Sequence, residues 1–198
     1  MKNKITAMSA IVAAVLIAMT SLTGCKEDKP AMQAETSKAE VDSLKAVIAS
    51  LVAGTEETSK NLVKFDTLDF KVYSGQQWSR VHETHSEDVI CHWPDGKTTK
   101  GLAKHIEDLK ALFVFAPDTK VIEHPISFGS GNKTAVTGTF ECTFTKPMPI
   151  GGGKFIQPTG KKAKMAMCTI GIWKDGVMTE EYLYWDNLNF MQQLGIKQ

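Results

Sequence analysis

The sequence predicts an α+β domain, because helical periodicity in its first part gives way to strand periodicity in its second part. Up to residue 115, apolar residues recur every three or four positions, as they do along one face of a helix. From Val121 onward they alternate with polar residues, as in strands with one buried face. Helices that precede strands in this way are typical of α+β domains.

Three helices are expected in the first part of the domain. They cover residues 56–73, 76–86 and 101–115. The first has a single apolar stripe and stops at Ser74-Gly75, while the second places Trp78 inward. The third ends before Pro117, because the residue that precedes a proline avoids helical geometry.

Strands dominate the second part. They are expected at residues 89–92, 121–128, 134–145, 162–173 and 177–185. The last two form a hairpin around Lys174-Asp-Gly176, a strong turn signal. Residues 146–160 are rich in glycine and proline and form a long loop that could cover the mouth of a pocket. Asp186 is a suitable N-cap for a short final helix that stops at Gly195.

The N-terminus carries an export signal. Lys2 and Lys4 precede the apolar stretch 7–19, and Leu22-Thr-Gly-Cys25 then matches a bacterial lipoprotein box. Residues 1–24 are therefore expected to be a signal peptide, and Cys25 to carry the lipid that anchors the protein to a membrane. The alternative is an ordinary secretory signal that ends near a cysteine. The apolar run is short for a membrane-spanning helix, which needs roughly 20 residues.

Residues 25–55 are expected to form a tether with a helical stalk, and residues 56–198 the globular domain. Apolar residues recur at helical spacing over 41–51, and Gly54 ends this helix. The stalk acts as a spacer or pairs with another copy. The predicted location is the bacterial cell envelope. The outer membrane is favoured because no Asp follows Cys25, and the choice between periplasm and cell surface stays open.

Composition excludes one class of partner and leaves the redox state open. The sequence has 23 basic and 22 acidic residues, and Arg80 is its only arginine. No basic patch stands out, so nucleic-acid binding is not expected. Besides Cys25 there are three cysteines, Cys91, Cys142 and Cys168. They form one disulfide and one free thiol, or they stay as three buried thiols.

Three segments carry a resemblance to a known family. These are His92–Gly96, Phe115–Asp118 and the strand and helix of Thr179–Ile196. Over residues 56–196 the chain resembles the SnoaL-like polyketide cyclases of the nuclear transport factor two-like superfamily. The resemblance implies a cone-shaped, curved mixed sheet, wrapped by N-terminal helices around a pocket and followed by a short C-terminal helix. Homodimers are common in the superfamily, so a dimer is also expected.

The resemblance also suggests catalytic candidates. In such cyclases a carboxylate removes a proton beside a carbonyl, and the corresponding position here is Leu183, which cannot take a proton. Glu181 lies two residues earlier and shares its strand face. Asp186 matches a second family Asp and is also the expected N-cap. His92 matches a histidine ahead of the Pro-Asp-Gly turn and is the polar candidate at the rim.

A further set of apolar and aromatic residues is expected to line the pocket and bind a ligand: Trp78, Trp93, Met165, Met167, Tyr182 and Trp185. Tyr182 lies on the strand face opposite Trp185, so only one of these faces can look inward. His82, His85 and His92 lack a carboxylate or cysteine at a ligand spacing, so neither a metal nor another cofactor is expected. His105 and His124 are interpreted as surface or edge residues.

Three functions are compatible with these features. The first is a lipid-anchored protein that binds a small hydrophobic molecule with little or no catalysis. The second is a cyclase- or isomerase-type enzyme that uses Glu181 or Asp186 as a base with His92 as partner. The third is a structural or dimerising envelope protein whose cavity is filled by its own side chains. Fold analogy alone does not choose between them.

Overall fold

The structure is a computed structural model that describes residues 31–196. The signal peptide, Cys25 and the first part of the tether lie outside this range. The chain divides into two compact units, residues 1–46 and 47–198, and the second contains the whole sheet. Among the described residues, no helix is both long and apolar enough to cross a membrane.

A single helix, α2 (Ala31–Thr67), takes the place of the two helices predicted around Gly54. The predicted stop at Gly54 is therefore wrong. A glycine inside a helix costs only about 1 kcal/mol relative to alanine. At Gly54, contacts that the next turn of the helix makes with the sheet favour continuation of the helix. The Oγ1 of Thr58 lies 2.8 Å from the carbonyl oxygens of both Gly54 and Gly131, which ties the helix to a turn of the sheet. The helix then passes into one π-helical turn, η1 (Leu68–Tyr73).

The predicted helix 76–86 is shorter than expected and is not an α-helix. It is the 3₁₀-helix η2 (Trp78–Glu83), and strand β1 (His85–His92) begins two residues later. His85 already pairs with the last strand of the sheet, so the backbone there is extended rather than helical. Strand β2 (Thr98–Lys100) and helix α3 (Leu102–Phe115) follow, the latter as predicted.

Six strands form the sheet, in the order β2-β1-β8-β7-β4-β3. The remaining members are β3 (Lys120–Ser130), β4 (Lys133–Thr143), β7 (Lys162–Lys174) and β8 (Val177–Trp185). Neighbouring strands are antiparallel except β1 and β8, which are parallel. Two short strands, β5 (Met148–Pro149) and β6 (Phe155–Ile156), pair within the predicted loop, and α4 (Asn187–Gln193) ends the described chain. The predicted α+β fold, with its curved mixed sheet, is confirmed.

A β-bulge in β8 decides which residues face inward. Met178 pairs with Trp173, but Glu180 pairs with Ile172, so Thr179 is the extra residue. A bulge shifts the alternation by one position. As a result Met178 and Glu181, three residues apart, are both buried.

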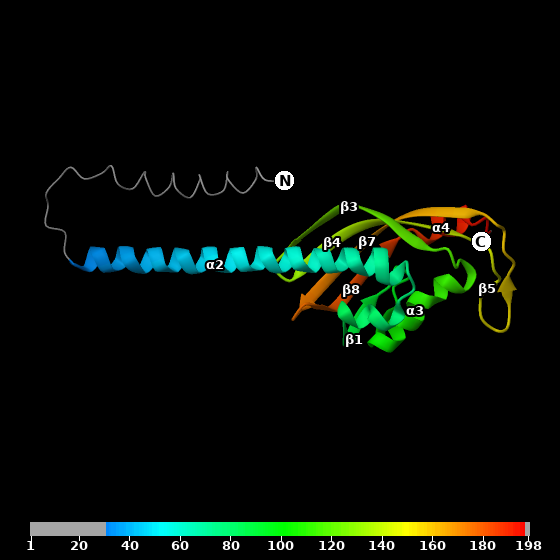
Figure 1. Cartoon of the computed structure of the whole chain (residues 1–198), viewed down its shortest axis with the longest axis horizontal. Helices are drawn as coiled ribbons and strands as arrows, with labels where there is room; N and C mark the ends of the chain where they lie inside the picture. Colours follow the sequence, from blue (N-terminus) through cyan, green and yellow to red (C-terminus); the bar gives the residue numbers. More distant parts are fainter. Residues whose placement is uncertain (1–30, 197–198) are drawn as a thin grey trace. The chain divides into compact units, whose positions relative to one another are not determined.

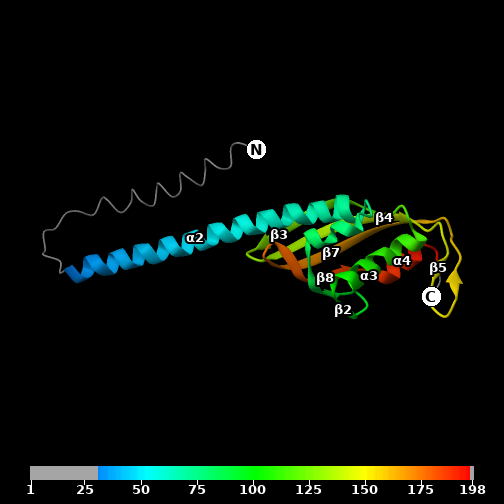
Figure 2. The ribbon, with the colours of Figure 1, turned by 60° about the horizontal axis from the view of Figure 1, so that its bottom comes forward.

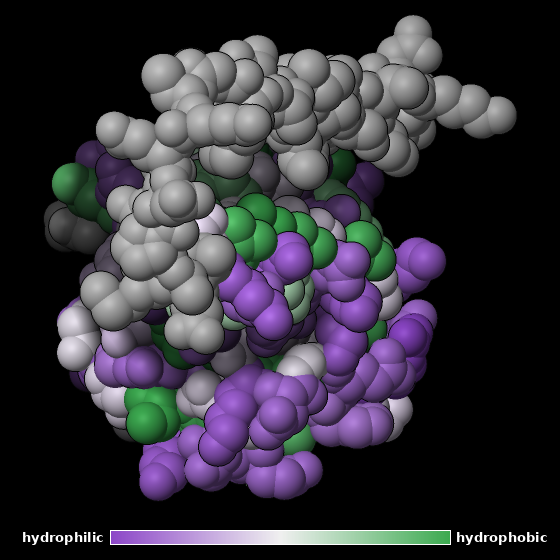
Figure 3. All heavy atoms as spheres, turned by 90° about the vertical axis from the view of Figure 1, so that its left-hand side faces the viewer, coloured by the Kyte–Doolittle hydropathy of each residue, from purple (hydrophilic) through white to green (hydrophobic). Residues whose placement is uncertain are grey.

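Helices cover one face of the sheet (Figures 1 and 2). Their side chains form two hydrophobic clusters with the sheet. In one, residues at the end of α2 and in η1 pack against Val136, Trp173 and Met178. In the other, α4 and the end of α3 pack near Phe140 and Met165. Among the described residues visible in Figure 3, hydrophilic side chains predominate, with hydrophobic ones in small groups between them.

The three cysteines in the described part of the chain are free thiols. Cys142 and Cys168 lie on neighbouring strands, but the register places Cys142 opposite Ala163 and Cys168 opposite Thr137. A disulfide needs Cα atoms within about 7 Å of each other and Cβ atoms that face each other. Of the two alternatives from the sequence, the structure has the one without a disulfide.

Candidate functional site

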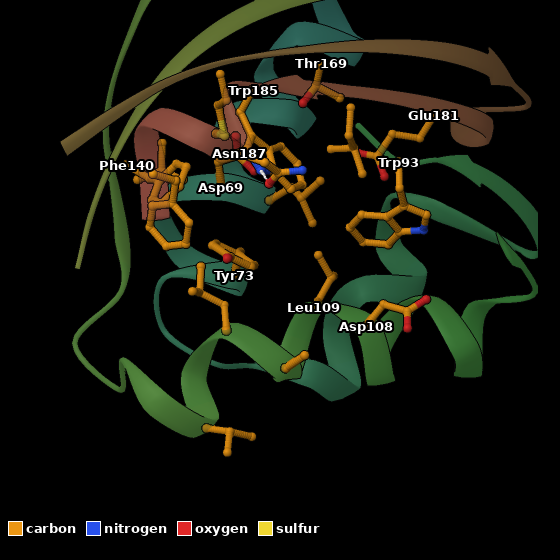
Figure 4. Close-up of a pocket in the computed structure, with 18 of the residues that line it drawn as sticks. Asp69, Tyr73, Trp93, Asp108, Leu109, Phe140, Thr169, Glu181, Trp185 and Asn187 are labelled. Carbon is orange, nitrogen blue, oxygen red and sulfur yellow. Dashed lines mark hydrogen bonds between the residues drawn. The ribbon is translucent and has the colours of Figure 1, made fainter. Parts of the chain in front are cut away.

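A cavity of about 430 Å³ lies between the helices and the inner face of the sheet. Most of its wall is apolar, built from η1, α3 and the inward residues of β4, β7 and β8. Polar groups interrupt this wall at seven positions: Asp69, Tyr73, His85, Asp108, Thr169, Glu181 and Asn187. In Figure 4, Glu181 and Trp93 lie at the opposite side of the space from Phe140 and Tyr73. An apolar cavity with a few polar groups is the usual form of a small-molecule site.

Two histidines surround the carboxylate of Glu181. Its Oε2 lies 3.4 Å from Nε2 of His105 and 3.7 Å from Nε2 of His85. The Sγ of Cys91 lies 3.8 Å from the same oxygen and 3.0 Å from Nδ1 of His105. All four residues are buried. The cluster thus brings together one carboxylate, two imidazoles and one thiol.

The four members of this cluster come from three elements of the fold, β1, α3 and β8. The bulge in β8 turns Glu181 inward, and the parallel neighbour β1 contributes His85 and Cys91. His105 comes from α3, one turn after Leu102, on the side of the helix that faces the sheet. The cluster therefore depends on the parallel β1–β8 pairing and on the packing of α3 against β1.

Burial and mutual contact set the charges of the cluster. Burial raises the pKa of Glu181, but the neighbouring His85 and His105 outweigh it, so its pKa lies below the ordinary value. Burial lowers the pKa of His105 to about 4. Burial also raises the pKa of the Cys91 thiol, with help from the charge of Glu181. At neutral pH the carboxylate is ionised, and both His105 and the thiol are uncharged.

A second carboxylate on the cavity wall, Asp69, is paired with a histidine. Nε2 of His124 lies 2.9 Å from Oδ2 of Asp69, and Nδ1 lies 2.7 Å from Oδ1 of Asp66. Burial raises the pKa of Asp69. Burial lowers the pKa of His124, but the hydrogen bonds to Asp69 and Asp66 outweigh it and raise the pKa overall. His124 was interpreted as a surface or edge residue, but only 5% of its side chain is exposed.

Asp108 and Tyr73 complete the polar wall. Oδ1 of Asp108 accepts a hydrogen bond of 2.7 Å from Nζ of Lys104, while the buried Oδ2 has no partner among the described residues. Burial raises the pKa of Tyr73, so the phenol stays protonated and can donate a hydrogen bond.

Four of the residues singled out from the sequence line the cavity: Glu181, Trp93, Met167 and Trp185. Because Trp185 is on the inner face of β8, Tyr182 is on the outer face. There its ring stacks on His92 at a centroid distance of 4.2 Å. His92 in turn lies 2.7 Å from Oε1 of Glu180. His92 and Tyr182 are therefore not part of the cavity wall.

The other three predicted residues have structural contacts. Asp186 caps α4, because its Oδ1 accepts a 2.9 Å hydrogen bond from the backbone N–H of Asn189. Trp78 packs edge-on against Tyr73 and Phe113. Met165 is buried in the core cluster near α4. None of the three belongs to the cavity wall as described.

Three members of the cluster were not predicted as site residues. Cys91 was considered only as a thiol or disulfide partner, and of the two histidines one carried a signal. His105 was interpreted as a surface residue, but it lies between Leu102 and Leu109 at spacings of three and four residues, so it belongs to the apolar stripe of α3. His85 was assigned to a helix and compared only with His82 and His92. Its inward direction depends on the start of β1, which has no clear sequence signal.

Comparison with known proteins agrees with this architecture. Residues 66–194 match the family described as SnoaL-like polyketide cyclase. The chain belongs to this family. A search of curated proteins found no match.

Solved structures of similar fold include two proposed polyketide cyclases. One, a SnoaL-like protein from Jannaschia, is 17% identical with a TM-score of 0.61, over 71% of this chain and 94% of that chain. The other, IdmH from Streptomyces antibioticus, is 18% identical with a TM-score of 0.58, over 70% and 99%. A proposed hydroxylase, AclR from Streptomyces galilaeus, is 15% identical with a TM-score of 0.55, over 71% and 82%. These similarities show that the SnoaL-like domain has the nuclear transport factor two-like fold.

Proposed function

We propose that this protein binds a small, mostly apolar and uncharged molecule in the cavity beneath its sheet. The observation that carries the proposal is the cavity of about 430 Å³ with a largely apolar wall. Volumes of roughly 300–1,000 Å³ are usual for small-molecule sites. A protein whose cavity was filled by its own side chains would not leave this space, so the third function from the sequence is not supported.

The polar groups of the cavity indicate which ligands fit. Three carboxyl groups, those of Asp69, Asp108 and Glu181, face it, and no Lys or Arg is among the described residues of its wall. An anionic ligand would meet these carboxylates without a compensating charge. A neutral ligand with hydroxyl groups could donate hydrogen bonds to them. Because the phenol of Tyr73 can donate a hydrogen bond to a carbonyl oxygen, neutral polycyclic or long-chain alcohols and ketones are the class that we expect.

Dye binding to the purified protein tests this proposal. The neutral dye Nile red should bind at one site per chain, while the anionic dye anilinonaphthalene sulfonate should bind more weakly. Leu183→Trp would fill part of the cavity and should weaken Nile red binding at least about tenfold, which corresponds to about 1.4 kcal/mol. Tyr184→Trp is the matched control, because Tyr184 is exposed and is not part of the cavity wall. Equal binding by both variants would contradict the proposal.

A second candidate is an enzyme of the cyclase or isomerase type. It is favoured by one observation, the buried carboxylate of Glu181 on the cavity wall beside two histidines. Such a carboxylate can remove a proton next to a carbonyl. The hydrogen–deuterium exchange of cyclic ketones in D₂O, followed by NMR, tests this function. Glu181→Gln should abolish any catalysed exchange, while Glu180→Gln, on the neighbouring half-exposed residue, should leave it unchanged. Exchange that survives Glu181→Gln would exclude this role.

The lipid anchor is part of the same proposal. It rests on the sequence Leu22-Thr-Gly-Cys25 after a basic and apolar leader. Cys25→Ser should move the protein from the membrane fraction to the soluble fraction of the envelope. An unchanged distribution between the two fractions would contradict lipidation at Cys25.

A further inference from the structure

We propose that His85, His105 and Glu181 bind one divalent transition-metal ion, of the zinc or iron class, at the wall of the cavity. The ligand atoms are Nε2 of each histidine and Oε2 of the glutamate, and they all lie within 4.8 Å of one another. This goes beyond ligand binding, because it adds a Lewis acid to the cavity. It also differs from the prediction from sequence that no metal is bound, which considered His85 together with His82 and His92 and not with His105.

The hydrogen bonds around His85 fix its tautomer. Its Nδ1 lies 2.9 Å from Oγ1 of Thr84 and 3.3 Å from the carbonyl oxygen of Val81. The Thr84 hydroxyl donates to the same carbonyl, at 3.1 Å, so it is not available to donate to the ring. Nδ1 therefore carries a hydrogen, and Nε2, which faces Glu181, is the nitrogen with which a neutral imidazole would bind a metal. This buried Nε2 has no hydrogen-bond partner among the described residues.

His105 is arranged in the same way. Its Nδ1 lies 3.0 Å from Sγ of Cys91, and the Cys91 thiol donates toward Oε2 of Glu181 at 3.8 Å. With its hydrogen directed at the carboxylate, the sulfur accepts from Nδ1, and Nε2 of His105 also presents a lone pair to Glu181. Two imidazole nitrogens and one carboxylate oxygen thus converge in a buried place. A cation satisfies all three at once.

The spacing of the three atoms suits a metal ion better than direct contact. The distances from Oε2 of Glu181, 3.4 and 3.7 Å to the two Nε2 atoms, are long for hydrogen bonds. In a tetrahedral site with bonds of about 2.0–2.1 Å, neighbouring ligand atoms are separated by about 3.3 Å. The two distances from Oε2 need only small shifts to reach this value, and the two histidine nitrogens lie within 4.8 Å of each other. Two histidines and one carboxylate are a ligand set of zinc hydrolases and of non-haem iron sites.

The position of the ligands relative to the cavity suggests what the metal would do. His85 and Glu181 both belong to the cavity wall, so the open coordination position would face the ligand. A carbonyl or hydroxyl oxygen of the bound molecule could occupy that position and be polarised there. A Glu181 carboxylate that binds the metal is not free to act as a base, so this role replaces the acid–base role of the second candidate function.

Metal binding to the purified full chain tests the proposal. The protein is analysed for metals as purified, then treated with a chelator and titrated with Co²⁺ and Zn²⁺. We expect one ion per chain, with Co²⁺ visible absorption typical of four- or five-coordinate sites. Glu181→Gln and His105→Ala should each lower the affinity about 100-fold or more, since even outer-sphere partners contribute roughly 10- to 100-fold. Glu180→Gln and His82→Ala, which change neighbouring or exposed residues, should leave it unchanged.

A second measurement keeps the test independent of whether the variants fold. In the wild-type protein, bound Co²⁺ should give strongly shifted NMR signals from the ring N–H groups of two histidines, at Nδ1 in each case. Failure of the wild type to take up either ion with micromolar affinity would overturn the proposal. Uptake that Glu181→Gln leaves unchanged in a folded variant would overturn it as well. Nile red binding by the same samples separates a failed metal site from a failed ligand cavity.

Discussion

Replacement of His124 by leucine tests how strongly the second carboxylate of the cavity depends on its partner. The His124 and Asp69 side chains are 5% and 12% exposed and lie 2.9 Å apart. His124→Leu removes the only hydrogen-bond donor to the Asp69 carboxylate among the described residues, while it keeps an apolar group against Phe70. Removal of one partner from a buried pair is strongly destabilising, by roughly 3–5 kcal/mol.

Protonation of Asp69 sets the largest loss of stability that this replacement can cause. Without its partner, Asp69 can fold in its neutral form, and the cost is that of protonating a carboxyl with an ordinary pKa of 3.8. At 1.36 kcal/mol per pH unit, this is about 4 kcal/mol at pH 7 and about 1.6 kcal/mol at pH 5. The free energy of unfolding of the His124→Leu variant should therefore fall from pH 5 to pH 7, by up to about 2.7 kcal/mol at 1.36 kcal/mol per pH unit.

The sign of the wild-type pH dependence can be stated as well. The pKa of His124 in the folded protein is raised above its ordinary value of 6.5, so its contribution is complete below pH 6.5 and is lost as the pH rises through the raised pKa. The pKa of Asp69 is also raised, mainly by burial, so this carboxyl too favours the folded state more at low pH.

Urea unfolding at pH 5 and pH 7 measures these free energies. The control is Asp66→Asn, which removes the other carboxylate partner of His124. Asp66 is 53% exposed at its side chain, so this change should cost about 1 kcal/mol or less. Asp69→Asn in the His124→Leu background should remove this fall between pH 5 and pH 7. Equal losses in His124→Leu and Asp66→Asn, or a His124→Leu stability that does not fall from pH 5 to pH 7, would refute this reasoning.

Two further predictions concern two glycines of the sheet and the N-cap of α4. A Cβ at Gly129 would overlap the backbone across the β3–β4 turn, whereas at Gly138 it would meet only the flexible end of Met167, at 2.6 Å. Gly129→Ala should therefore lower the free energy of unfolding by about 2 kcal/mol or more and Gly138→Ala by less, and the reverse order in urea unfolding would contradict this. Asp186→Ala should cost about 1 kcal/mol through the loss of the cap on α4, and Asp186→Asn should cost little. An equal loss in both would mean that the carboxylate charge, rather than the cap, is what matters.

The sequence was a good guide to the fold wherever local pattern and tertiary packing agree. The hairpin at Lys174–Gly176 was predicted from its turn residues, and Asp175 and Gly176 do adopt positive φ angles of 52° and 77°. The alternation along 134–143 was equally clear. Gly54 was misread because its low helix propensity is outweighed by the length of α2 and by contacts with the sheet, which no local pattern records.

The cavity and its charges were harder to predict, for a geometric reason. The sequence predicts that Glu181 shares a strand face with Leu183, but it leaves open whether this face or that of Tyr182 looks inward. Its neighbours were not predicted, because His85 and His105 come from elements far from β8 in the sequence. Asp69 was missed because nothing in its own segment indicates that His124 will lie beside it. Such pairs arise only from tertiary structure.

The parallel pairing of β1 with β8 has a consequence for incomplete molecules. In the sheet, β8 lies between β1 and β7. In the sequence, β1 is the first strand of this sheet and β8 is the last. A chain that ends before Val177 lacks β8, so β1 and β2 have no link to the rest of the sheet. It also lacks Glu181, the carboxylate beside His85 and His105. Chains cut before Val177 should therefore lack a formed pocket.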